Sequence, residues 1–303
     1  MLVLAFAAGR VMAQTPLVTL FEGEPTDQRT ISVGSWGGGT ASEATDFYLV
    51  GRESIKVRTS NLYRGARVDL VTPVDVSKAI ANPNAYLQFA VYSTNRVSNN
   101  NTNLVDPSKG ATPGTYNPGS YVPGGGSGTT TDIGYSPITE IRVILFFEEG
   151  ALVLDRQRVE PYRQDQAGWS KFSIPVSKFG GGLSGYHLKR VVFCGNADDS
   201  VYLGEIQFVE DSTAIIVGVG EDYEVWKGTP IGMLAIADGG AATLQYEWDF
   251  DAKDGVTVDA TGPIGQHTYM DPGDYTVTIT VKDVDGIKAP KKIENMVHVI
   301  SGG

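Results

Sequence analysis

The sequence contains a single cysteine, Cys194, among its 303 residues, so no disulfide can form within the chain. The apolar residues Val191–Phe193 precede it and Gly195 follows it, which is the pattern of a buried strand end. We therefore predict that Cys194 is a buried structural thiol and not a catalytic nucleophile.

Histidine is also scarce, with three residues in the chain. The sequence has neither a Gly-x-Ser-x-Gly elbow nor a His-Glu-x-x-His motif, which would indicate a hydrolase or a metalloprotease. The adjacent Glu148 and Glu149 do not form an acid–base pair, because neighbours on a strand point to opposite faces. These absences predict a protein that is not an enzyme.

Basic residues are outnumbered by acidic ones, 24 against 35, and the net charge is −11. A protein with this charge repels phosphate backbones, so we expect no nucleic-acid partner. No stretch of about 20 apolar residues follows the N-terminal segment, so we expect no membrane span.

Residues 1–13 resemble the last part of a signal peptide. Met1–Ala8 is apolar, Val11–Ala13 places small residues where a signal peptidase reads them, and Gln14 would begin the mature chain. This pattern predicts a secreted or cell-surface protein. The alternative is that the segment forms a first β-strand.

Glycine is abundant, with 37 residues, and many short runs carry an apolar residue at every second position. Such alternation between glycine-rich turns favours β-strands. The expected strands are residues 54–58, 66–70, 86–92, 141–147, 151–154, 171–174, 188–193 and 202–208. No helical periodicity separates them, so the sequence predicts an all-β fold with a jelly-roll-like β-sandwich over residues 17–211.

One segment of this sandwich, residues 94–134, breaks the strand pattern. It is rich in Asn, Pro, Gly, Ser and Thr and cannot bury enough apolar surface to offset the entropy of ordering it. We predict a flexible insert between two strands.

The last 90 residues carry a more specific pattern. A Trp-Asp-Phe strand at Tyr246–Asp251 precedes the turn His267–Tyr269, and the Pro272–Gly273 corner leads into a long alternating strand that ends at Val281. This pattern resembles the PKD (polycystic kidney disease) domain. The resemblance implies an immunoglobulin-like β-sandwich over residues 213–301, joined through a short linker at Glu210–Ser212.

The residues of the PKD-like motif have structural roles in this interpretation. Trp248 is large and apolar and is expected to fill the space between two sheets. Tyr275, Val277, Ile279 and Val281 are expected to alternate inward, with polar threonines outward. We predict a scaffold with no catalytic site.

The N-terminal sandwich resembles carbohydrate-binding modules in four segments: Phe21–Glu24, Gly51–Val57, Gly168–Pro175 and Tyr202–Phe208. The resemblance implies a polysaccharide or cell-surface glycan as partner. It also implies a structural Ca²⁺ between the first and last strands. The matching positions for that ion are Glu22 or Glu24 with Glu205, since calcium takes six to eight oxygen ligands.

Sugar rings stack on exposed aromatic side chains, so exposed aromatic residues are the candidates for a binding site. Trp36 lies in a run of glycines and is the first candidate, followed by Tyr63 and Tyr92. The alternative for Trp36 is a plug at one end of the sandwich. Trp169 and Trp226 are expected in a core or between domains.

Three functions remain open from the sequence. The first is a secreted or surface protein that binds extracellular polysaccharide. The second is a structural or adhesive spacer in a surface or matrix assembly. The third is a polysaccharide-active enzyme with an unrecognised site.

Overall fold

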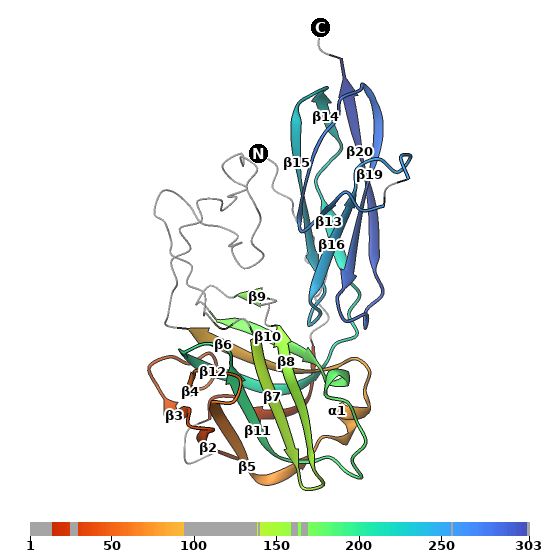
Figure 1. The fold of residues 1–303 in the computed structure, drawn as a ribbon. Coiled ribbons are helices and arrows are strands. Elements are labelled where there is room, and N and C mark those ends of the chain that lie inside the picture. Colours follow the sequence, from red (N-terminus) through yellow and green to blue (C-terminus); the bar gives the residue numbers. More distant parts are fainter. Residues whose placement is uncertain are drawn as a thin grey trace. The chain divides into compact units, whose positions relative to one another are not determined.

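The computed structural model describes residues 14–24, 30–93, 138, 140–158, 163–164, 169–255 and 257–301. These residues form two compact units, 14–211 and 212–301, which are described separately (Figure 1). The expected insert 94–134 and the expected signal segment 1–13 both lie outside the described residues. Strands make up nearly all of the regular structure in both units, which confirms the predicted all-β class.

The N-terminal unit contains two antiparallel sheets. Sheet A has the order β3-β4-β12-β6-β10-β9, with β1 also paired to β12. Sheet B has the order β2-β5-β11-β7-β8. The strands of sheet A are β1 (Thr15–Phe21), β3 (Thr40–Ala44), β4 (Ser54–Thr59), β6 (Ala85–Ser93), β9 (Arg163–Gln164), β10 (Ser170–Pro175) and β12 (Asp199–Glu210). The strands of sheet B are β2 (Ile31–Trp36), β5 (Gly65–Asp75), β7 (Glu140–Phe147), β8 (Ala151–Arg158) and β11 (His187–Gly195).

The inner faces of the two sheets share one hydrophobic core. Alternate residues of each strand point into it, as the sequence pattern predicted. Phe89 from sheet A meets Phe193 from sheet B edge-on, with ring centroids 5.0 Å apart. The short helix α1 (Ser77–Ala81) and the 3₁₀ helix η3 (Val176–Phe179) bury Ala79, Val176 and Phe179 against the same core.

The boundary between the units falls between Asp211 and Ser212. The Asp211 amide donates to the Asn84 carbonyl, 3.0 Å away, and so belongs to the first unit. The Lys288 ammonium donates to the Thr213 carbonyl at 2.8 Å, which ties Thr213 into the second unit.

The C-terminal unit is a second β-sandwich. One sheet has the order β13-β15-β18 and the other β14-β20-β19-β16-β17; β14 pairs with β20 in parallel. The first sheet contains β13 (Ile216–Val219), β15 (Pro230–Asp238) and β18 (Ile264–Thr268). The second contains β14 (Tyr223–Trp226), β16 (Leu244–Asp249), β17 (Ala260–Thr261), β19 (Gly273–Asp283) and β20 (Lys291–Ile300).

Trp248 on β16 occupies the centre of this second core, as predicted. Its side chain is fully buried, and its indole N–H donates to the Gly262 carbonyl at 2.7 Å. Val277, Ile279 and Val281 on β19 are likewise fully buried. The motif tryptophan is therefore a packing residue whose single polar group has a partner.

Candidate functional site

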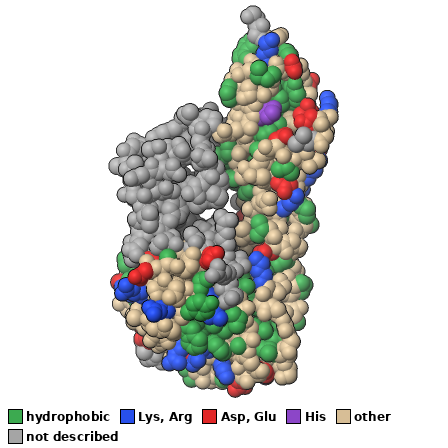
Figure 2. All heavy atoms as spheres, viewed as in Figure 1, with side chains coloured by type: hydrophobic (Ala, Val, Ile, Leu, Met, Phe, Trp, Pro, Cys, Tyr) green, Lys and Arg blue, Asp and Glu red, His purple; other side chains and the backbone are tan. Residues whose placement is uncertain are grey.

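The outer face of sheet B brings together aromatic and cationic side chains. Val68, Val191 and Leu145 point into the core, so their strand neighbours point outward. Strand register places Trp36, Gly65, Cys194 and Arg142 in one row across the sheet. It places Asp69, Arg190 and Phe146 in a second row. We call this surface the outer face of sheet B (Figure 2 shows hydrophobic side chains over β7 and β8 with Lys and Arg beside them).

Trp36 is the last residue of β2 and is half-buried. Its indole lies 5.6 Å from the Phe146 ring, at an interplanar angle of 53°. Beneath it lie the buried side chains of Ile144, Val192 and Cys194. Gly65 is its cross-strand neighbour on β5, where an added Cβ would lie 1.9 Å from the Phe193 carbonyl oxygen. Trp36 therefore packs on the outer face of sheet B, at the end of β2.

Arg190 lies over this aromatic pair. Its guanidinium carbon is 6.0 Å from the Trp36 centroid and 5.9 Å from the Phe146 centroid, which is cation–π distance. Its Nε atom hydrogen-bonds to Asp69. Arg67 on β5 forms an ion pair with the same carboxylate, at 3.3 Å. Sequence reasoning missed Arg190 because its partner Asp69 is 121 residues away in the chain.

Tyr63 lies at the same end of the face as Trp36. The Tyr63 amide donates to Asn61 Oδ1 at 2.9 Å, which fixes the turn before β5. The Tyr63 carbonyl packs against Gly37, where φ is 59° and an added Cβ would lie 1.9 Å from that oxygen. The Tyr63 ring is 61% exposed, and the Arg142 guanidinium carbon lies 4.8 Å from its centroid.

Cys194 lies below the tryptophan and is buried, as predicted. Burial raises the pKa of the Cys194 thiol to about 11, while the charge of Arg142 opposes the shift. A thiol with this pKa is protonated near neutral pH and is a poor nucleophile.

Tyr92 lies on sheet A, on the opposite side of the sandwich from Trp36 and Tyr63. It stacks on Phe47 at 4.7 Å and lies 5.6 Å from Trp169, which is buried. The neighbouring Tyr202 is also buried; its hydroxyl donates to Asp46 at 2.7 Å, which lowers the pKa of that carboxyl. The three predicted aromatic residues therefore do not form one site.

The predicted calcium ligands do not gather. Glu205 forms an ion pair with Lys171 at 2.8 Å, and Glu24 accepts a hydrogen bond from the Glu22 amide. Among the described residues, no group of three or more His, Cys, Asp or Glu is arranged to hold a metal ion. Calcium binding stays a prediction. It would be contradicted if the protein unfolds at the same temperature in calcium and in EDTA.

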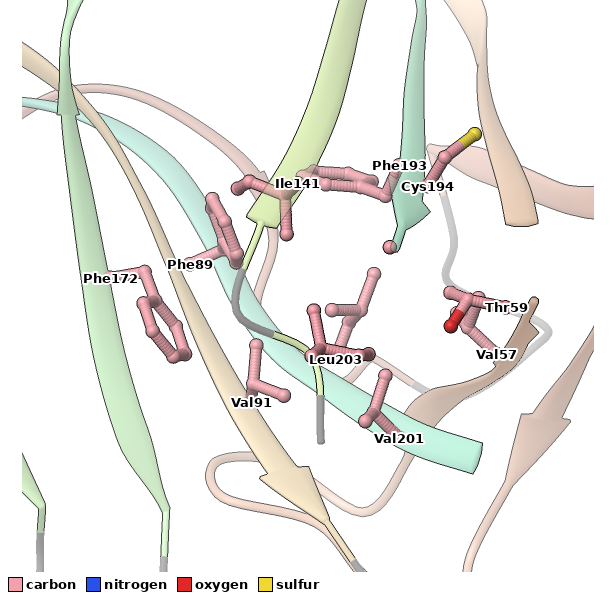
Figure 3. A pocket seen from close by; sticks show the side chains of 12 residues that line it. Val57, Thr59, Phe89, Val91, Ile141, Phe172, Phe193, Cys194, Val201 and Leu203 are labelled. Carbon is pink, nitrogen blue, oxygen red and sulfur yellow. The ribbon is translucent and has the colours of Figure 1, made fainter. Parts of the chain in front are cut away.

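A cavity of about 60 Å³ lies between the two sheets (Figure 3). Its walls are almost entirely apolar and include Phe89, Ile141, Phe172 and Leu203. The Cys194 sulfur points away from it, toward the outer face (Figure 3). An apolar lining offers few hydrogen-bond partners for the hydroxyl groups of a sugar.

Trp226 was expected in a core or between domains, but it is 53% exposed and is no core residue. It ends β14, an edge strand, where Val225 packs into the core and Trp226 points the opposite way. Neither α1 nor η3, the helices of the described part of the chain, is long enough to cross a membrane.

Comparison with known proteins identifies the C-terminal unit. Residues 215–298 match the family model of the PKD domain, which confirms the resemblance seen in the sequence. PKD domains are typically extracellular, non-catalytic β-sandwich modules. The C-terminal unit is thus a β-sandwich of the PKD type over residues 215–298.

No curated protein matches the chain. Solved structures that match include the fibronectin(III)-like modules of Clostridium thermocellum CbhA, with 12% identity and a TM-score of 0.25. That match covers 55% of this chain and 80% of the other. Similarity at this level indicates no ligand.

Proposed function

We propose that the protein is a non-catalytic extracellular module that binds polysaccharide through the outer face of sheet B. The observation that carries the proposal is the position of Trp36 and Tyr63. The two residues are separated along the chain, yet they lie at one end of the same sheet face. Their rings offer apolar surface for sugar faces, and Arg142 beside Tyr63 offers hydrogen-bond donors for sugar hydroxyls.

The binding energy expected from such a site is modest. An aromatic stacking contact contributes about 1 kcal/mol beyond the area it buries, and the proposed binding face is only partly aromatic. Affinity for a short oligosaccharide should be weak, and retention on a polymer should gain from repeated binding along it. The isolated monosaccharide is therefore a poor probe, and an insoluble polymer is a good one.

The test is retention of the whole protein on a panel of insoluble polysaccharides. Trp36→Ala and Tyr63→Ala should each reduce retention. The matched controls are Trp226→Ala and Tyr48→Ala, which remove an exposed tryptophan and an exposed tyrosine located elsewhere, 53% and 51% exposed. The controls should be retained like the wild type. Circular dichroism confirms that each variant is folded.

Two outcomes would overturn the proposal. If Trp36→Ala and Tyr63→Ala fold and are retained like the wild type, the outer face of sheet B is not the binding surface. If no polysaccharide retains the wild type, the function as a structural or adhesive spacer takes its place. Release of reducing sugar from any polymer would instead indicate an enzyme.

A further inference from the structure

Two guanidinium groups on the outer face of sheet B share one carboxylate. Arg67 and Arg190 flank Asp69, and both form ion pairs with it. Among the described residues, Asp69 is the acidic residue with which each of the two arginines forms an ion pair. The Arg67 Nε atom is buried and makes no hydrogen bond, although it lies 3.3 Å from Asp69. One positive charge of this group of three is therefore not balanced by Asp69.

The Arg190 guanidinium is held in place before any ligand arrives. Asp69 fixes its Nε atom, and the rings of Trp36 and Phe146 lie about 6 Å from its centre. The Arg190 side chain keeps 30% of its surface exposed and Arg67 keeps 42%. The terminal nitrogens of a guanidinium held through Nε present parallel N–H donors, which suit a planar anion such as a carboxylate.

The sign of the charge on this face differs from that of the protein. The chain as a whole has a net charge of −11. Among the described side chains on the outer face of sheet B, three are basic and two are acidic. The basic ones are Arg67, Arg142 and Arg190, and the acidic ones are Asp69 and Glu140. A polyanion is repelled by the protein in general, so a local excess of arginine beside aromatic rings would orient it onto this face.

We propose that the polysaccharide bound by the protein is acidic. A carboxylate or sulfate of the polymer binds Arg67 and Arg190, while a neighbouring sugar ring lies against Trp36. This inference rests on the proposed function and specifies its ligand class. Carboxylate and sulfate share the chemistry that a guanidinium pair recognises, and the two are separated by the choice of polymers.

The experiment compares polymers that differ in charge alone. Polygalacturonate is set against the same polymer after full methyl esterification, and dextran sulfate against dextran. The wild-type protein should bind one acidic polymer at least about tenfold more tightly than its neutral match, the size expected for hydrogen bonds to a charged group. Added salt should weaken this binding, because it screens exposed charges. Binding to both acidic polymers but not to polyglutamate shows that the sugar is also required.

Variants assign the effect to the arginine pair. Arg190→Gln should lose the tenfold preference, and Arg190→Lys should recover part of it, because lysine keeps the charge but not the planar fork. The matched control is Arg58→Gln, which removes an arginine paired with Asp198 on sheet A and should keep the preference. Loss of the preference in both glutamine variants would mean that overall charge, not this pair, directs binding.

The outcomes separate this inference from the proposed function. Equal binding to acidic and neutral polymers, with loss in Trp36→Ala, overturns the inference and retains the glycan-binding function. Binding to polyglutamate as tight as to polygalacturonate also overturns it. No binding to any polymer of the set or of the earlier panel overturns both.

Discussion

The Trp36 indole on β2 and the Phe146 ring on β7 lie 5.6 Å apart, although β5 and β11 separate their backbones in sheet B. Both rings pack against the same buried side chains, Ile144 on β7 with Val192 and Cys194 on β11. The tryptophan thus covers the apolar centre of the face while Arg190 lies over its ring.

Replacing Trp36 with alanine should expose this layer. We expect a loss of about 2 kcal/mol in the free energy of unfolding, less than for a fully buried tryptophan, because the side chain is half-buried. We also expect Cys194, whose pKa burial raises to about 11, to react faster with a thiol reagent. Denaturant unfolding and the rate of thiol modification measure the two effects. Tyr63→Ala is the control, and a Cys194 rate unchanged by Trp36→Ala would show that the indole does not cover the thiol.

The sequence predicted much of the fold because its signals are local. Alternation of apolar residues marks strands such as Ser54–Thr59 without knowledge of their partners. The Trp-Asp-Phe motif around Trp248 identified the PKD domain and assigned that tryptophan to the core. Both features depend on neighbours within a few residues.

The candidate site could be predicted only in part, because it depends on strand register. The glycines around Trp36 suggested an exposed loop residue, but Phe146 and Arg190, which determine its environment, are more than 100 residues away in the chain. A charged residue such as Arg190, next to the apolar Val191, is expected to point outward, yet nothing local pairs it with Asp69. The same limit applies to Tyr92, which local pattern could not assign to the opposite sheet.

The His187–Glu149 pair should give a measurable pH dependence. The Glu149 carboxylate hydrogen-bonds to the His187 ring and raises the pKa of His187 above its ordinary value of 6.5. The same contact lowers the pKa of Glu149. The stabilisation from His187 is present below its unfolded pKa and is lost as pH rises through the raised folded pKa. The stabilisation from Glu149 is present above its unfolded pKa and is lost as pH falls through the lowered one.

An NMR titration of the histidine ring protons measures this effect directly. Glu149→Gln should return the pKa of His187 toward its ordinary value. The same substitution should leave the pKa of His298 unchanged, because that pKa is raised by a separate contact with Asp274. A His187 pKa that is the same in both proteins would show that the contact does not persist in solution.

Asp283 should be important for the stability of the PKD domain. It is buried, and its two carboxylate oxygens accept hydrogen bonds from the amides of Asp285, Ile287 and Lys288, each 3.0 Å away. Asp283→Ala leaves these amides without that acceptor, so we expect a loss of about 2 kcal/mol in the free energy of unfolding. The control is Asp238→Ala, where an exposed carboxylate accepts one hydrogen bond, from Gly240. Urea unfolding compares the two, and equal losses would contradict the prediction.

Gly265 on β18 tests the packing of the PKD core most directly. A Cβ added at this buried residue would lie 2.4 Å from Cδ2 of Trp248 and 2.8 Å from Cε2 and Cε3. The indole cannot yield easily, because its N–H is bonded to the Gly262 carbonyl and its ring stacks on Phe250. We expect Gly265→Ala to lower the free energy of unfolding by about 1–3 kcal/mol, the cost of overpacking a core.

Gly232→Ala is the matched control for this variant, on the paired strand β15, where an added Cβ meets no atom within 4 Å. It should leave the urea midpoint nearly unchanged. Because phenylalanine is smaller than tryptophan, the alanine at position 265 should cost less in a Trp248→Phe background, and the double-mutant cycle measures that difference. If Gly265→Ala costs the same in both backgrounds, the strain does not arise from the contact with Trp248. In that case, close packing of the Trp248 indole against the backbone does not explain why residue 265 is a glycine.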